Sequence, residues 1–234
     1  MNNATLRLKV MQRLNKLASN DYDNIECWQI VEAFNKAQVQ WVRRQLVGIN
    51  ILKQGDEQSK RKIDDLQPLL SIADMAYSNM PGYVISETLP DDYMEFKRVD
   101  AYGKNDCCPD SRRFVVYLAE EANAAILLRD DNKKPSFDWA ETFCTLAGNK
   151  IKIYTNDDFI VTDAKLMYYR EPVKIQIQGC VNPYTGFVST ADVECEFKED
   201  ITETLIDEAV QVLAGDIESI TQYQIASTSG EENS

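Results

Sequence analysis

Apolar residues in the first eighty positions recur every three or four residues, which places them along one side of a helix. Such stripes lie within 6–17, within a segment that follows Asp23 and runs to about residue 52, and within 58–77. The third segment is interrupted by Pro68, which lacks the N–H that a helix interior needs. The pattern predicts two or three antiparallel helices before residue 80.

The pattern changes at 80–82, Met-Pro-Gly, after which the side chains favour strands and turns. Apolar and polar residues alternate at 150–154, at 164–170 and at 173–177, as they do in half-buried strands. Residues 114–118 fit either a strand or a short helix. This part of the chain is therefore predicted to be rich in β structure.

Two large residues precede the first of these alternating segments. Trp139 and Phe143 are predicted to anchor the core of the β unit, and the Asn-Asp-Asp cluster at 156–158 predicts a turn. Residues 179–186 have the composition of a loop. Residues 176–198 are long for a plain connection, and an arm or loop that reaches a neighbour is one interpretation of them; their role is left open.

The chain closes with a predicted helix whose start has the spacing of a capping box. Asp200 and Glu203 are three residues apart, so that each side chain can satisfy a free N–H of the first turn. An apolar stripe then runs from Leu205 to Ile220, and 227–234 has the composition of a disordered tail.

These elements predict an α+β fold. It consists of an N-terminal helical bundle (1–82), a β-rich domain with loops that holds a small antiparallel sheet (83–198), and a C-terminal helix that packs on the bundle (199–226), followed by the tail (227–234). One domain with a helical extension suits a chain of 234 residues.

Charge limits the partners of the chain. The net charge of −13 argues against a protein that wraps nucleic acid, because affinity for phosphate comes from Lys and Arg. The charge is uneven: residues 1–62 carry eleven basic and six acidic side chains, whereas the chain from Glu199 onward has nine acids and no base. The sequence has no apolar run of membrane-spanning length and no signal-peptide core, so we expect a protein that folds in a cytoplasm.

Residue usage also limits the chemistry. The absence of histidine excludes the Ser-His and Cys-His nucleophile systems, and the glycines form no phosphate-binding loop. Six cysteines without CxxC spacing predict free thiols and neither a zinc site nor a disulfide framework. No metal or cofactor is expected.

Carboxylate chemistry is the enzymatic alternative. Paired aspartates at 91–92, 130–131 and 157–158 are able in principle to act as acid and base, as in a cell-wall glycosidase. Each pair lies in turn-like sequence, where Asp is favoured for its local hydrogen bonds. A binding or structural protein that is not an enzyme is the better class.

Six stretches, in this order over residues 5–175, carry a family resemblance: LRLKVMQRLNKL, IVEAFNKAQVQWVRRQL, LPDDYMEFKRV, KPSFDW, NKIKIYT and AKLMYYREPVKI. Together they resemble the head–tail connector (adaptor) proteins of tailed bacteriophages, most closely those of short-tailed phages such as the crAss-like group. The turn Leu-Pro-Asp-Asp-Tyr and the ending Tyr-Tyr-Arg-Glu-Pro are the most specific parts.

The resemblance implies a helical bundle with a small β domain, about a dozen copies of which form a ring around a DNA channel. The implied partners are further copies of the chain, the portal protein, a tail or second adaptor ring protein and the double-stranded DNA that passes through, with no membrane. The implied location is the virion at its head–tail interface, after assembly in the host cytoplasm. Another tail or stopper ring component is the alternative.

The family offers no active-site residues, so the contact residues are chosen by position in the predicted strands and last helix. The predicted interaction residues are Tyr93, Lys152, Tyr154, Tyr168, Arg170, Asp207 and Glu208.

Overall fold

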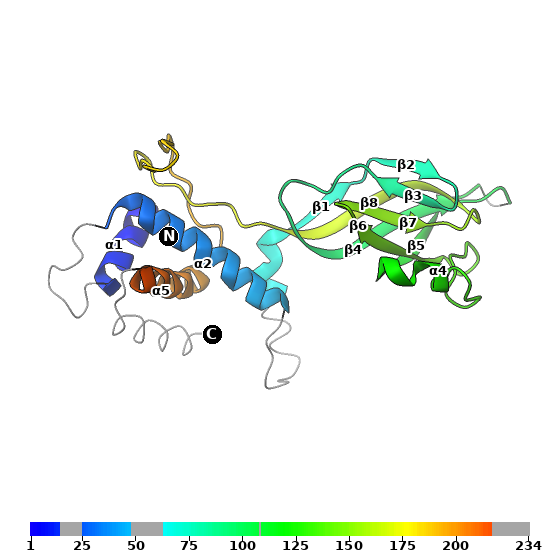
Figure 1. The fold of residues 1–234 in the computed structure, drawn as a ribbon, viewed down its shortest axis with the longest axis horizontal. Coiled ribbons are helices and arrows are strands. Elements are labelled where there is room, and N and C mark those ends of the chain that lie inside the picture. Colours follow the sequence, from blue (N-terminus) through cyan, green and yellow to red (C-terminus); the bar gives the residue numbers. More distant parts are fainter. Residues whose placement is uncertain (15–24, 48–62, 108, 217–234) are drawn as a thin grey trace, which may run out of the picture. The chain divides into compact units, whose positions relative to one another are not determined.

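The chain divides into two compact units, each with a buried core of its own. The helical unit comprises 1–68 and 172–234, and the sheet unit comprises 69–171 (Figure 1). The structure is a computed structural model that describes residues 1–14, 25–47, 63–107 and 109–216.

Some predictions fall outside these described residues. They concern the end of the second helix near residue 52, the end of the last helix near 226 and the disordered tail 227–234.

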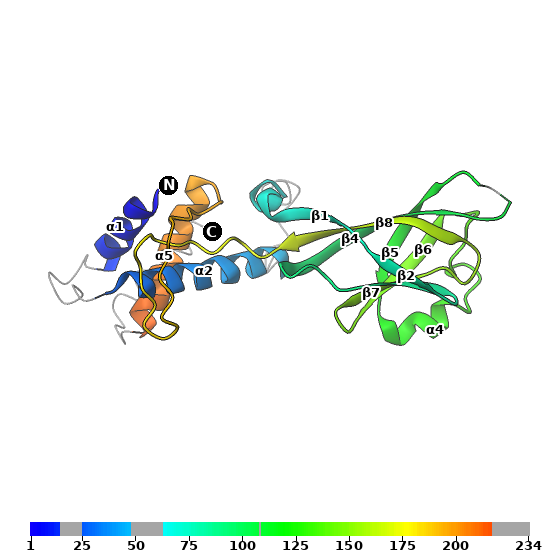
Figure 2. The ribbon, with the colours of Figure 1, turned by 90° about the horizontal axis from the view of Figure 1, so that it is seen from above.

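Among the described residues of the helical unit, its core is formed mainly by α1 (Asn3–Leu14), α2 (Cys27–Val47) and α5 (Glu199–Asp216). Both α1 and α2 pack against α5, so the C-terminal helix closes a core that the first two helices begin (Figure 2). The apolar stripes explain this packing, since Leu6, Phe34 and Leu205 are fully buried. The ring of Trp41 meets that of Phe197 edge to face, with 5.3 Å between their centres.

Residues 173–177 belong to the helical unit and are extended without joining a sheet. Ile175 is fully buried, its N–H donates to Oδ1 of Asn35 at 2.8 Å, and its carbonyl accepts from Nδ2 of Asn35 at 3.3 Å. One side-chain amide thus replaces the partner strand that the alternating pattern predicted, and this strand prediction is wrong.

The sheet unit contains eight strands: β1 (Leu70–Asp74), β2 (Tyr77–Met80), β3 (Tyr83–Ser86), β4 (Tyr93–Lys104), β5 (Arg112–Ala119), β6 (Glu141–Ala147), β7 (Lys150–Tyr154) and β8 (Ile160–Arg170). They form one sheet in the order β1-β8-β4-β5-β6-β7-β3-β2. β5 and β6 pair in parallel, and the other neighbours pair antiparallel. The sheet is therefore mixed.

The sheet is strongly curled. β1 and β2 stand at opposite ends of the strand order, yet only Met75 and Ala76 separate them along the chain. The two edges must therefore lie close together, and the concave face encloses one apolar core. Phe114 lies within this core, and its ring stacks on that of Phe159 with 4.1 Å between the centres. A Cβ on Gly103 would lie only 2.9 Å from the Phe159 ring, so the glycine allows this close packing.

A short crossover covers part of the outer face. The 3₁₀ turn Glu121–Asn123 and helix α4 (Ala124–Leu127) connect the parallel strands β5 and β6. Beneath them Phe143 is fully buried and stacks on Tyr154 at 4.6 Å. Phe143 is thus a core residue, as predicted. Trp139 is 80% exposed, so its predicted anchoring role is wrong.

The predicted fold class is wrong. The curled eight-stranded mixed sheet is the main feature of the described chain, and the few helices do not form an N-terminal bundle that carries a small antiparallel domain. The helical prediction within 58–77 holds for 63–66, which are helical, and for the 3₁₀ turn Gln67–Leu69 that follows, but it is wrong from Leu70 onward, which lies on edge strand β1. After Pro68 the chain pairs with β8.

Candidate interaction arm of the helical unit

Residues 176–193 fold into a narrow two-stranded ribbon, which we call the arm. At its base Gln176 and Val193 exchange two backbone hydrogen bonds of 3.1 and 2.9 Å. Further out, Ser189 N–H donates to the carbonyl of Cys180 and Gly179 N–H donates to that of Ser189, both at 2.9 Å. These bonds fix the register of the ribbon although it joins no larger sheet.

The base of the arm is held by Asn3 at the start of α1. The side chain of Asn3 is buried, and its Nδ2 donates to the carbonyls of Gln176 (2.7 Å) and Val193 (3.2 Å). Asp192 accepts from the same Nδ2 and from the N–H of Gln178 at 3.0 Å. One polar residue of α1 thus joins both strands of the arm.

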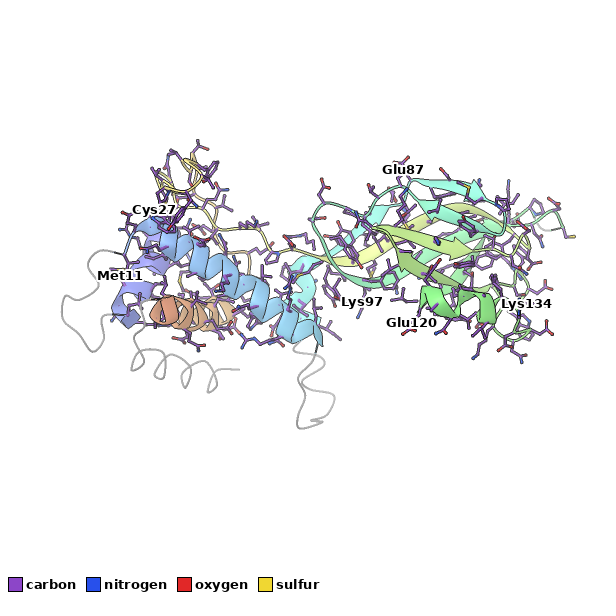
Figure 3. All side chains as sticks on the ribbon, viewed as in Figure 1. Met11, Cys27, Glu87, Lys97, Glu120 and Lys134 are labelled. Carbon is purple, nitrogen blue, oxygen red and sulfur yellow. A yellow bond between two sulfur atoms is a disulfide. The ribbon has the colours of Figure 1, made fainter. Side chains whose placement is uncertain are left out.

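A disulfide between Cys27 and Cys180 ties the middle of the arm to the start of α2. Cys27 lies where the arm meets this end of the helix (Figure 3). The prediction of free thiols is therefore wrong for this pair. The two residues are 153 positions apart, so no local spacing in the sequence could have shown the bond.

The other described cysteines carry free thiols. Cys107 is exposed, whereas Cys144 and Cys195 are buried. Burial raises the pKa of the Cys144 thiol to about 12, and burial also raises the pKa of Cys195. Both buried thiols are therefore protonated and poor nucleophiles at neutral pH.

The tip of the arm is a tight turn that presents aromatic rings to solvent. Oδ1 of Asn182 accepts hydrogen bonds from the N–H groups of Tyr184 (2.9 Å) and Thr185 (3.3 Å). Tyr184 is 83% exposed and Phe187 is 54% exposed. The Tyr184 ring rests edge-on against Trp28 of α2, with 5.3 Å between centres. The Tyr184 ring thus contacts α2 although most of its surface is exposed.

Apart from Asp192 at its base, the arm also lacks charge. No Asp, Glu, Lys or Arg occurs from Ile175 to Ala191, in a chain in which 27% of residues are charged. Depletion of charge together with enrichment in aromatic residues is typical of the centre of a protein interface. This run of seventeen uncharged residues is the sequence signal for the arm, whereas the interpretation of 176–198 as an arm or loop rested on its length alone.

Neither the protein-family models nor the curated proteins gave a match to the chain. Its function is therefore argued from its own residues.

Of the predicted interaction residues, Lys152 and Tyr154 lie together on the outer face of the sheet around Glu121. Lys152 forms an ion pair with Glu121, and the hydroxyl of Tyr154 donates to the same carboxylate at 3.3 Å. The hydrogen bond from Lys152 lowers the pKa of Glu121, and the hydrogen bond from Thr145 lowers it further by a smaller amount. This group fastens the crossover to the sheet.

Tyr93 and Tyr168 form a second group, with stacked rings 5.8 Å apart. The Tyr168 hydroxyl donates to Asp92 at 2.8 Å, and burial, reinforced by that carboxylate, raises its pKa to about 12. Arg170, at the end of β8, is half-buried and donates to the carbonyl of Glu171 at 3.1 Å. These contacts all lie within the sheet unit.

Asp207 and Glu208 lie on α5 in the helical unit and are both buried. Arg13 of α1 donates to Asp207 at 2.7 Å, and Arg44 of α2 forms an ion pair with Glu208. Glu203, which was predicted to cap α5, instead pairs with Lys9 and Arg13. The helix already begins at Glu199, so the capping-box prediction is wrong.

Members of two of the aspartate pairs accept hydrogen bonds from backbone N–H groups. Asp130 accepts from the N–H of Asn132 (3.0 Å), and Asp157 accepts from that of Gly82 (2.7 Å). Within the described ranges, no group of three or more Cys, Asp or Glu side chains is placed to hold a metal ion. No helix there is long and apolar enough to cross a membrane.

Two carboxylates of α5 should give opposite pH effects. Burial opposes ionisation of Glu203, but Lys9 and Arg13 outweigh it and lower its pKa. The stabilising effect of ionised Glu203 is present above pH 4.5, the ordinary pKa of glutamate, and is lost as the pH falls through the lowered pKa. We expect Glu203→Gln to reduce the free energy of unfolding by about 1 kcal/mol at neutral pH and to have no effect in acid.

Glu208 is the matched control on the same helix. Burial raises its pKa, and Arg44 only partly offsets this. The stabilising effect of this group is fully present below pH 4.5, its ordinary pKa, and is lost as the pH rises through the raised pKa. Glu208→Gln should therefore not destabilise the protein at neutral pH. Urea unfolding of both variants across the acid range measures the two effects, and equal losses at neutral pH would contradict this assignment.

Proposed function

We propose that the chain is a structural virion protein, a head–tail connector subunit that assembles into a ring beneath the portal, links capsid to tail and lines the DNA channel. The observation that carries the proposal is the arm: a ribbon whose one charged residue is Asp192 at its base, which is fixed at its base and middle and whose aromatic tip is exposed. The order of sequence stretches that resembles phage connector proteins supports it independently.

The attachments of the arm to α1 and α2 suit a segment that binds another protein. Asn3 and the disulfide hold it in one conformation before any partner arrives. A contact made by a rigid element loses less conformational entropy than one made by a loose loop. Exposed Tyr and Phe side chains supply the kind of area that dominates binding energy in protein interfaces.

The charge of the chain suits a DNA conduit. A ring of subunits that each carry −13 presents a surface that does not bind the DNA backbone, so that DNA slides through. The same charge makes copies repel one another at long range. Contact through the uncharged tip of the arm avoids placing like charges opposite each other at the interface.

Assembly of the purified chain tests the proposal. We expect mass photometry over a concentration series, with and without portal rings from the same virus, to show a closed oligomer of defined size. Negative-stain images should show rings that cap the portal. Rings that form but bind a tail tube instead of the portal would favour the stopper or tail-ring alternative. A chain that stays monomeric and ignores portal rings would refute a connector role.

A further inference from the structure

A groove between α2 and α5 is the feature of the helical unit to which no role has been assigned. It has a volume of about 390 Å³, within the range of pockets that hold small ligands or side chains. Its lining residues are Gln40, Arg43, Arg44, Glu208, Gln211 and Val212. The groove lies toward the C-terminal end of α2, whereas the arm is bonded to the other end at Cys27.

The lining of the groove includes a positively charged side chain, Arg43, and an apolar one, Val212. The ion pair with Glu208 holds Arg44 in position. Arg43 is exposed and makes no ion pair in the part of the chain that the structure describes. Val212 is half-buried and supplies an apolar surface. A guanidinium at the face of an aromatic ring is a favourable contact, so an aromatic side chain that packs on Val212 can also contact Arg43.

The arm of the same copy cannot fill this groove. Sixteen residues separate Cys27 from Arg43 along α2, which corresponds to about 24 Å. Only four residues lead from Cys180 to Tyr184, and an extended chain of that length spans about 13 Å. Even with the 5.8 Å between the Cα atoms of Cys27 and Cys180 added, the backbone of the tip does not reach Arg43. The contact between Tyr184 and Trp28 also holds the tip at the N-terminal end of α2.

We infer that the tip of the arm of one copy, Tyr184 and Phe187, docks in the α2–α5 groove of the next copy. The inference rests on the proposed function and names the contact by which the ring forms. The two surfaces lie at opposite ends of α2, so the contact is head-to-tail. A contact of this kind repeats from copy to copy and gives a ring when the rotation closes.

Photo-cross-linking locates the contact. p-Benzoylphenylalanine placed at position 187 in the full chain should cross-link to residues 40–44 or 208–212 of a second copy, as identified by mass spectrometry. The same group at Val115, an exposed site of the sheet unit, is the control and should not reach the groove. Cross-links from position 187 to the arm of another copy would show a symmetric contact and overturn the inference.

Complementing variants test the direction of the contact. Tyr184→Ser with Phe187→Ser removes the tip, and Arg43→Glu alters the groove. Each should weaken self-association at least about tenfold. The matched control is Lys36→Glu, which makes the same charge change at another exposed position of α2 and should assemble normally.

A mixture of the tip variant and the groove variant retains one intact contact per pair. It should give heterodimers that do not grow further, as measured by mass photometry, and rings from the mixture would overturn the inference. The two proposals fail in different ways. Rings that form with the tip variant refute the docking contact but leave the connector role intact, whereas a wild-type chain that never associates, with or without portal rings, refutes both.

Discussion

Replacing Cys27 and Cys180 together by serine is expected to lower the free energy of unfolding of the helical unit by about 3 kcal/mol. The bond joins residues 153 positions apart, so its loss returns much freedom to the unfolded chain. The enclosed sheet unit can remain folded, which shortens the flexible part of the loop and moderates the gain. Urea unfolding followed by far-UV circular dichroism and by the fluorescence of buried Trp41 measures the change.

Two controls separate the bond from the substitutions. Cys107→Ser changes an exposed free thiol and should leave the free energy of unfolding within about 0.5 kcal/mol of wild type. Reductant should destabilise the wild type by about as much as the double substitution does, and should leave the double variant unaffected. A wild-type midpoint that does not respond to reductant would show that the bond contributes nothing to stability.

The sequence predicted strands best where burial alternates along them. The predicted strand 150–154 is confirmed as β7 with the same bounds, and 164–170 falls within β8. Residues 114–118, left open between strand and helix, lie in β5. In each case local side-chain preference and the tertiary environment favour the same conformation.

The curled sheet could not be predicted in this way. The order of its strands depends on pairs such as Leu70 with Tyr169 and Val84 with Ile153, which lie far apart in the sequence. Nothing in the alternation of one strand identifies its partner. Strand β1 lies at the edge of the sheet and pairs with β8 alone. The apolar residues of this strand were predicted to continue a helix.

The candidate site was missed for a related reason. Tyr154 and Tyr168 were expected at an interface because tyrosine is common there, but both are buried and bond to Glu121 and Asp92. The arm depends on Asn3 and Cys27, which come more than 140 residues earlier in the chain. Only the absence of charge from 175 to 191 was visible in the sequence.

Phe114→Ala is expected to destabilise the sheet unit by about 4 kcal/mol. Phe114 is 1% exposed and stacks on Phe159, and its ring lies 6.0 Å from that of Phe137. Gly103 closes the other side of this cluster, and a glycine has no side chain that could move into the space. The cavity therefore stays largely open, which places the loss toward the upper part of the range for such truncations. Urea unfolding measures it.

Val115→Ala is the matched control because it truncates the next residue of the same strand, whose side chain is 60% exposed. We expect a change within about 0.5 kcal/mol. Hydrogen exchange followed by mass spectrometry locates the effect: Phe114→Ala should speed exchange in peptides from 93–119 and 141–170, and Val115→Ala should not. Equal effects of the two substitutions would mean that β5 does not turn Phe114 into the core and Val115 outward, and the curled sheet described for 69–171 would have to be revised.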